Sequence, residues 1–184
     1  VKVQPRAKPS EDELHQAMLN GIRDKGLSVL NWTAEAEQLR LRLLCAAKWL
    51  PEYDWPAVDD ESLLATLETW LLPHMTGVHS LRGLKSLAIY QALRGLLDWG
   101  MQQRLDSELP AHYTVPTGSR IAIRYHEDNP PALAVRMQEM FGEATNPTIA
   151  QGRVPLVLEL LSPAQRPLQI TRDLGAFWKG AYRE

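Results

Sequence analysis

The sequence contains one cysteine, carries a formal net charge of only −2, and has no long apolar run. A lone Cys45 excludes an internal disulfide and a cysteine-based zinc cluster, and it suits a reducing compartment. The longest apolar segment, near residues 39–44, is interrupted by Arg40 and Arg42 and falls short of the roughly 18–20 apolar residues that cross a bilayer. We therefore expect a cytoplasmic protein without a membrane span.

The first nine residues contain two prolines and three basic residues and show no apolar period. They lack the apolar centre of a signal peptide, and their composition is typical of a linker that leaves a preceding domain. The chain also starts at Val1, without an initiating methionine. We interpret residues 1–9 as a linker and the chain as a fragment of a longer protein.

The charges are distributed unevenly along the chain. Up to Pro110 there are 12 basic and 15 acidic residues, with six acids and no base between Glu52 and Glu68. From Ala111 onward there are 8 basic residues, seven of them arginine, and 7 acidic residues. The small net charge excludes a general attraction to polyanions, so we expect any contact with nucleic acid in the second part.

Residues 10–110 show the apolar period of helices. Ser10 and Glu13 form a capping box, and the helix that they begin is expected to end at Gly26. Further helices are predicted from Thr33 to Leu50, from Asp59 or Asp60 to a point before Pro73, and across Ser80–Ser107 with a break near Asp98.

Residues 111–184 change to the period of strands. Four segments rich in β-branched and apolar residues are separated by turn sequences, and they are residues 112–115, 120–125, 154–161 and 168–171. In the second segment apolar side chains alternate with Arg120 and Arg124, as in a half-buried antiparallel strand. Helices are predicted from Pro130 to Gly142 and from Asp173 through Trp178.

The sequence thus predicts an α+β fold. A linker, residues 1–9, precedes an N-terminal helical part, residues 10–110, and a small, mainly antiparallel β-sheet unit with helices follows in residues 111–184.

Three segments come close to catalytic motifs and fail on spacing. In Gly83–Ser86 a leucine separates the glycine from Lys85, and no strand precedes the segment. His126 and Glu127 lack the second histidine that a zinc protease needs, because Pro130 stands there, and Ser119 lacks one glycine of a nucleophile elbow. We expect no catalytic residue, no metal site and no cofactor site in this chain.

The arginines of the second part remain as candidates for a binding site. Arg120 and Arg124 share one strand face, about 13 Å apart. Arginine suits phosphate because its planar fork donates two parallel hydrogen bonds. The alternative is a solvated face that Glu127, Glu139 and Glu159 neutralise. The predicted nucleic-acid-binding residues are Arg120, Arg124, Arg136, Arg153, Arg172 and Lys179.

The six tryptophans could offer stacking platforms for bases. Most of them lie in or beside amphipathic helices, which favours a role in the core or at a domain interface. The same reasoning makes Cys45 a buried apolar residue.

Several segments of the chain resemble the carboxyl-terminal region of the bacterial HrpB family, ATP-dependent helicases of the DEAH/DExH-box group. The close matches are Val115–Ile121, Pro130–Gly142, Gly152–Pro163, Arg166–Leu174 and Phe177–Tyr182. Weaker matches in the helical part are Leu30–Trp32, Trp70–Pro73 and Leu105–Pro110, so that about 175 residues are covered. The family's chains are expected to continue past Glu184 with a basic segment.

The resemblance implies a parent protein that hydrolyses ATP with Mg²⁺ and translocates on RNA, and in some cases DNA. The family's motor motifs have no counterpart in this sequence, so the resemblance implies an accessory module beyond the motor domains. In one hypothesis the module contacts single-stranded RNA or DNA through the arginine-bearing sheet. In the other it docks on the helicase core of the same chain or on a protein partner through its helical part and touches no nucleic acid.

Overall fold

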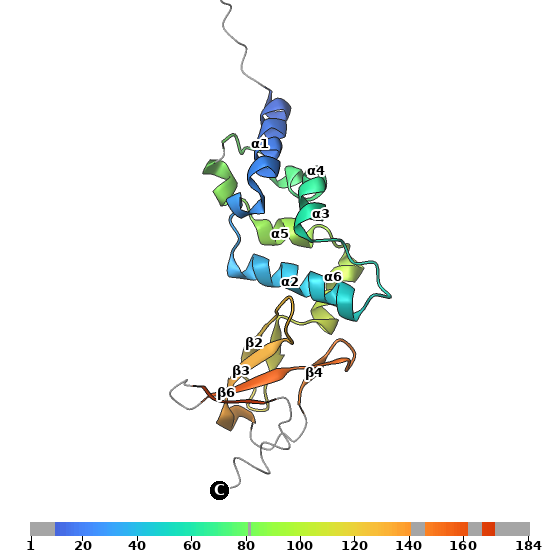
Figure 1. The fold of residues 1–184 in the computed structure, drawn as a ribbon, viewed down its shortest axis with the longest axis vertical. Coiled ribbons are helices and arrows are strands. Elements are labelled where there is room, and N and C mark those ends of the chain that lie inside the picture. Colours follow the sequence, from blue (N-terminus) through green and yellow to red (C-terminus); the bar gives the residue numbers. More distant parts are fainter. Residues whose placement is uncertain (1–9, 81, 141–145, 162–166, 172–184) are drawn as a thin grey trace, which may run out of the picture. The chain divides into compact units, whose positions relative to one another are not determined.

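The computed structural model describes residues 10–80, 82–140, 146–161 and 167–171 (Figure 1). Contacts group the chain into two compact units, Val1–Arg40 with Pro56–Leu97 (unit 1) and Leu41–Trp55 with Asp98–Glu184 (unit 2). Helix α2 (Ala34–Trp49) contributes its first residues to unit 1 and the rest to unit 2. The domain boundary expected at residue 110 follows the change from helices to strands rather than the contacts, and it stays a prediction.

Unit 1 consists of short helices. Beside the start of α2 it contains α1 (Glu11–Lys25), η1 (Leu27–Val29), α3 (Asp60–Ala65), α4 (Leu67–Trp70), η2 (Leu72–His74), η3 (Arg82–Ser86) and α5 (Ile89–Arg94). The hydroxyl of Ser10 accepts a hydrogen bond from the Glu13 amide at 3.2 Å, and Gly26 ends α1 with φ of 94°. Thr33 and Asp59 each accept from the amide three residues further on. The predicted helix starts are therefore confirmed.

The core of unit 1 is aliphatic and is closed by one large aromatic side chain. Trp70 is 2% exposed, and its indole N–H donates to the Leu63 carbonyl oxygen at 2.9 Å. Arg23 of α1 forms an ion pair with Glu68 of α4 and donates from Nε to the Leu64 carbonyl oxygen at 2.9 Å. The indole is thus buried with its polar N–H satisfied, and Arg23 links α1 to helices more than 40 residues away in sequence.

The helices of unit 2 are Leu41–Trp49 of α2 and α6 (Trp99–Glu108). Asp98 caps α6 by accepting from the Met101 amide at 2.8 Å, which confirms the break predicted there. Arg42, only 3% exposed, donates from Nε to the Leu109 carbonyl oxygen at 2.8 Å and from Nη2 to Asp106 at 3.0 Å. One buried guanidinium thus ties α2 to the end of α6.

Cys45 lies in the same part of α2, is 1% exposed, and donates from Sγ to the His126 carbonyl oxygen at 3.3 Å. Burial raises the pKa of this thiol to about 11. Because two pKa units reduce the thiolate fraction by about 100-fold, we expect iodoacetamide at pH 8 to modify native Cys45 at least about 100-fold more slowly than the urea-unfolded chain. Mass spectrometry of timed samples measures both rates, and equal rates would contradict this packing.

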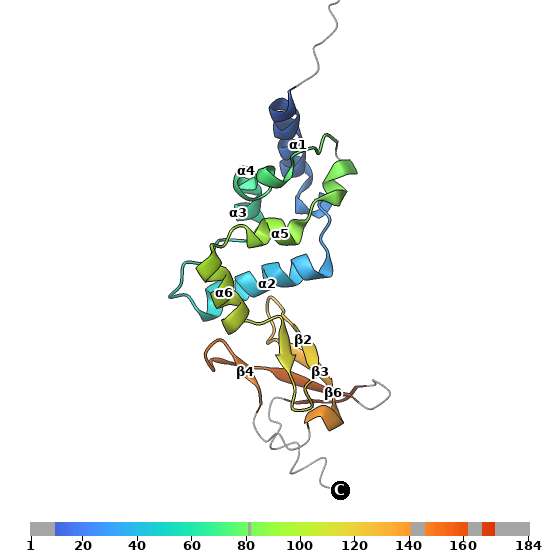
Figure 2. The ribbon, with the colours of Figure 1, turned by 180° about the vertical axis from the view of Figure 1, so that it is seen from behind.

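The sheet of unit 2 has five strands in the order β1-β2-β3-β6-β7 (Figure 2). They are β1 (His112–Thr114), β2 (Arg120–Arg124), β3 (Ala132–Arg136), β6 (Val157–Leu161) and β7 (Pro167–Thr171). All neighbouring pairs are antiparallel except β3 and β6, which are parallel. A separate hairpin pairs β4 (Thr148–Ile149) with β5 (Val154–Pro155). The predicted α+β class with a mainly antiparallel sheet is confirmed.

The helix predicted from Pro130 to Gly142 is wrong. Residues 132–136 form β3, and a short 3₁₀ helix, η4 (Met137–Met140), follows. Ala132, Leu133 and Val135 are buried and Ala134 is half-buried, so the strand lacks the apolar and polar alternation that identifies a one-sided strand. Gly142 and the helix predicted from Asp173 lie outside the described residues.

Candidate functional site

The register of the sheet brings three of the predicted arginines to one face. Arg124 of β2 stands opposite Ala132 of β3, and strand alternation therefore places Arg120, Arg124 and Arg136 on the same side. All three are exposed. The opposite side carries the core, which is formed by the buried residues Ile123, Tyr125, Leu133, Val135, Leu158 and Leu160. We call the exposed side the arginine face.

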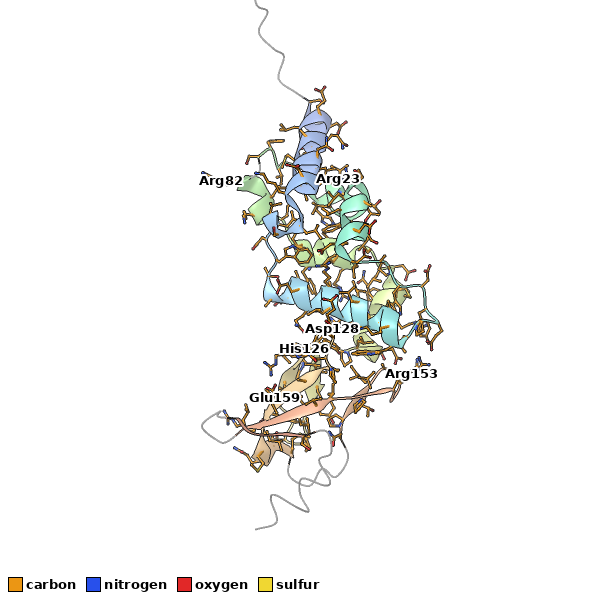
Figure 3. All side chains as sticks on the ribbon, in the orientation of Figure 1. Arg23, Arg82, His126, Asp128, Arg153 and Glu159 are labelled. Atoms are coloured by element: carbon orange, nitrogen blue, oxygen red, sulfur yellow. The ribbon has the colours of Figure 1, made fainter. Side chains whose placement is uncertain are left out.

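Glu159, which is labelled in Figure 3, is the acidic residue described on the arginine face, and it forms an ion pair with Arg124. The pairing reaches across β3, where Ala132 and Ala134 are too small to obstruct the long arginine side chain. The Arg124 side chain remains 50% exposed. An exposed ion pair of this kind is weak in water, so Arg124 can exchange its carboxylate for another anion.

Arg120 and Arg136 lie on either side of this ion pair along their strands. The side chain of Arg120 makes no hydrogen bond or ion pair with another described residue. Arg136 ends β3, opposite Leu161 of β6, and it is not without an interaction partner. Three arginines against one glutamate leave an excess of two positive charges among the side chains described on this face.

Arg153 lies apart from these strands, in the turn between β4 and β5 (Figure 3). Its Nη1 donates to the Trp49 carbonyl oxygen at 2.9 Å and to Glu52 Oε1 at 3.0 Å, and its Nη2 donates to Glu52 Oε2 at 2.6 Å. The hydrogen bonds to Glu52 raise the pKa of Arg153 and lower that of the carboxyl group. Arg153 is therefore held in a bidentate pair and is a poorer phosphate ligand than Arg120.

The remaining predicted residues, Arg172 and Lys179, lie outside the described residues. Of the six candidates, the structure brings three onto the arginine face and ties a fourth to Glu52. Whether any of them binds nucleic acid stays a prediction.

Sequence reasoning missed a cavity of about 390 Å³ beside Arg153. It is lined by Lys48, Trp49, Glu127–Pro130 and Arg153–Val157. Lys48 donates to the Glu127 carbonyl oxygen at 2.7 Å. Two bases and two acids line this cavity, so it carries no net charge to attract a polyanion. The residues come from three separate stretches of the chain, which no local motif could have linked.

Two further observations concern the segments that come close to catalytic motifs. Gly83–Ser86 lies in the 3₁₀ helix η3, and a Cβ at Gly83 would be 3.0 Å from the Val78 side chain. This glycine therefore approaches a valine of its own unit rather than leaving room for a phosphate. In the part of the chain that the structure describes, no group of three His, Cys, Asp or Glu side chains could hold a metal ion.

The tryptophans take different positions. Trp55 and Trp70 are buried, Trp32 and Trp49 are half-buried, and Trp99, in the first turn of α6, is 75% exposed. No helix among the described residues is both long and apolar enough to cross a bilayer.

The chain is similar to known helicase sequences and structures. Residues 70–184 match the family model described as ATP-dependent helicase C-terminal. The ATP-dependent RNA helicase HrpB of Escherichia coli (strain K12) is 97% identical over 184 residues, which are 100% of this chain and 23% of that protein. Crystal structures of the E. coli DExH-box NTPase HrpB (TM-score 0.94, 97% identity) and the Escherichia coli DEAH/RHA helicase HrpB (TM-score 0.90, 96% identity) are similar over the whole chain, which covers 23% of each.

Proposed function

Because this chain belongs to the ATP-dependent helicase C-terminal family, we propose that it is an accessory module of a cytoplasmic ATP-dependent RNA helicase that helps to hold single-stranded nucleic acid. The family membership confirms the resemblance predicted from the sequence. The motor activity, its ATP and its Mg²⁺ belong to the parent protein in this proposal. The contact with nucleic acid is assigned to the arginine face.

The observation that carries the proposal is the grouping of Arg120, Arg124 and Arg136 on one solvent-facing side of a rigid sheet. Guanidinium groups along an extended strand repeat at a spacing that can follow the phosphates of an extended single strand. No tryptophan is described on this face, so the contact reads phosphates and is independent of base sequence.

The residues present do not fit an ATP site. The segment nearest to a phosphate-binding loop, Gly83–Ser86, lies in a 3₁₀ helix, and no strand precedes it among the described residues of unit 1. The function that we propose for this chain therefore includes neither binding nor hydrolysis of ATP.

A second candidate function is protein docking without nucleic-acid contact. It is supported by Trp99, which is the large apolar side chain left exposed among the described residues. Tryptophan is enriched at protein interfaces because one large ring buries much apolar area. This candidate takes precedence if the arginine face binds no RNA.

The proposal is tested by the affinity of the chain for single-stranded oligouridylate and oligoadenylate of about 12 nucleotides at low salt. Fluorescence anisotropy of labelled RNA measures both constants. We expect weak binding that agrees between the two sequences within about threefold, because phosphate contacts carry no base information. Absence of binding, or a strong preference for one base, would contradict the proposal.

A further inference from the structure

Unit 1 contains a second hollow, which is far more apolar than the cavity beside Arg153. Its volume is about 350 Å³, and it is lined by Gly21 and Lys25 of α1, Val29 of η1, and Arg82, Leu84 and Lys85 of η3. Leu84 is 1% exposed and anchors η3 in the core, while Arg82, labelled in Figure 3, and Lys85 are exposed. A Cβ at Gly21 would meet no atom within 4 Å, so the glycine leaves this side of the hollow open. We call it the basic hollow.

The charges around the basic hollow are all of one sign. Lys25, Arg82 and Lys85 line it, and none of the described residues that line it is acidic. No side chain of the three makes a hydrogen bond or ion pair with another described residue. Two other arginines of unit 1 are neutralised within the unit, since Arg23 pairs with Glu68 and Arg40 pairs with Asp60. Three unpaired cations at one place are complementary to an anionic occupant.

The walls of the hollow identify the kind of anion. They are mostly aliphatic, from Val29, Leu84 and the methylene stems of the lysines, and they provide almost no polar surface. A phosphate group seeks hydrogen-bond donors inside its site, and a nucleobase seeks an aromatic platform, which the lining lacks. A large aliphatic or aromatic side chain fits such walls, with carboxylates beside it facing the three cations.

We infer that the basic hollow binds an acidic peptide segment of a separate protein, which inserts one large apolar side chain while its carboxylates pair with Lys25, Arg82 and Lys85. This docking goes beyond the proposed contact with nucleic acid and uses none of the residues of the arginine face. Burying the apolar anchor supplies most of the affinity, and the charges select against basic and neutral segments.

A second copy of this chain is a poor occupant. The most acidic stretch of the chain, between Glu52 and Glu68, has most of its carboxylates engaged. Glu52 pairs with Arg153, Asp59 caps α3, Asp60 pairs with Arg40, and Glu68 pairs with Arg23. Its peptide backbone is also committed to α3 and α4 over much of its length. This stretch of a second copy therefore has few carboxylates left to pair with the three cations, and an acidic segment of a separate protein is the occupant that we propose.

The test is a selection from a displayed library of random peptides of about 12 residues on the immobilised chain. We expect the retained peptides to combine several Asp or Glu residues with one or two large apolar residues. The most enriched peptide is then synthesised, and its affinity is measured by fluorescence anisotropy for the chain and its variants.

Two variants alter different properties of the basic hollow. Replacing Lys25, Arg82 and Lys85 by glutamate should lower the affinity for the peptide by at least about 30-fold. This is an order-of-magnitude effect for three reversed charges near a surface. Gly21→Leu changes no charge, places a side chain in the open space and raises the helix propensity of α1. It should lower the affinity for the peptide by at least about tenfold. Circular dichroism verifies that both variants fold.

Arg120→Glu with Arg124→Glu is the matched control, and it should change the affinity for the peptide by less than about twofold. The inference fails if the selected peptides are not acidic or if Gly21→Leu leaves the affinity for the peptide unchanged. It also fails if the variants of the basic hollow lose affinity for oligouridylate and keep their affinity for the peptide. It also fails if full-length E. coli HrpB, unlike this chain, retains no acidic peptide, because the occupant would then be another part of the helicase itself. Loss of RNA binding by the control alone bears on the proposed function and leaves this inference standing.

Discussion

Replacing Arg120 and Arg124 together by glutamate is expected to weaken binding of single-stranded RNA by about 100-fold or more. The change removes two cations from the arginine face and adds two carboxylates beside Glu159, so each phosphate contact becomes a repulsion. A loss of about 1.4 kcal/mol at each position corresponds to this factor. Both side chains are exposed, and the core lies on the opposite face, so the sheet should remain folded.

The control for this double variant is Lys25→Glu with Lys85→Glu. It changes the net charge by the same amount in unit 1, at two exposed lysines without a described partner. We expect it to change RNA affinity by less than about threefold, because neither lysine belongs to the arginine face that makes the proposed phosphate contacts. An unchanged affinity of the arginine double variant would leave protein docking as the function that the structure supports.

Replacing Arg42 by methionine is expected to lower the free energy of unfolding by about 2–4 kcal/mol. Methionine fills part of the space but cannot donate, so the buried Leu109 carbonyl oxygen loses its hydrogen bond, which costs roughly 1–3 kcal/mol. Lost packing of the guanidinium adds to this cost. Asp106 is 45% exposed and is rehydrated, so its contribution is small.

Arg40→Met is the matched control, two residues earlier in the same helix. Arg40 also donates from Nε to a carbonyl oxygen, that of Val58, at 2.7 Å, but its side chain is 24% exposed and its partner Asp60 is 75% exposed, so water can replace part of what the substitution removes. We expect a loss of about 1 kcal/mol. Urea unfolding followed by circular dichroism measures both variants. An equal loss of unfolding free energy in the two variants would show that the burial of Arg42 does not increase its contribution to stability.

The helix starts were predictable because capping is local. Ser10, Thr33, Asp59 and Asp98 each accept a hydrogen bond from an amide three residues away, and that relationship is visible in the sequence. Strand β2 was predictable for a related reason, since alternation with a period of two appears in one short segment. The same alternation correctly predicted that Arg120 and Arg124 lie on one face of the strand.

Strand β3 was not predictable in this way because alanines, and not polar residues, precede Arg136 on the side of the strand that belongs to the arginine face. A continuous apolar run after two prolines then resembles the start of a helix. The placement of Arg136 on the arginine face depends on the pairing of β3 with β2, which the sequence did not reveal. The bidentate pair of Arg153 with Glu52 joins residues 101 positions apart, which no local pattern reveals. The basic hollow likewise combines two segments far apart in sequence.

The salt dependence of RNA binding tests the central claim most directly. If the arginine face neutralises two to four phosphates of a single strand, the logarithm of the binding constant should fall with the logarithm of salt concentration at a slope of about −1.4 to −2.8, or about −0.7 for each phosphate. Anisotropy titrations with oligouridylate between about 50 and 200 mM salt measure this slope. A slope near zero, or no binding at about 50 mM salt, would contradict the account.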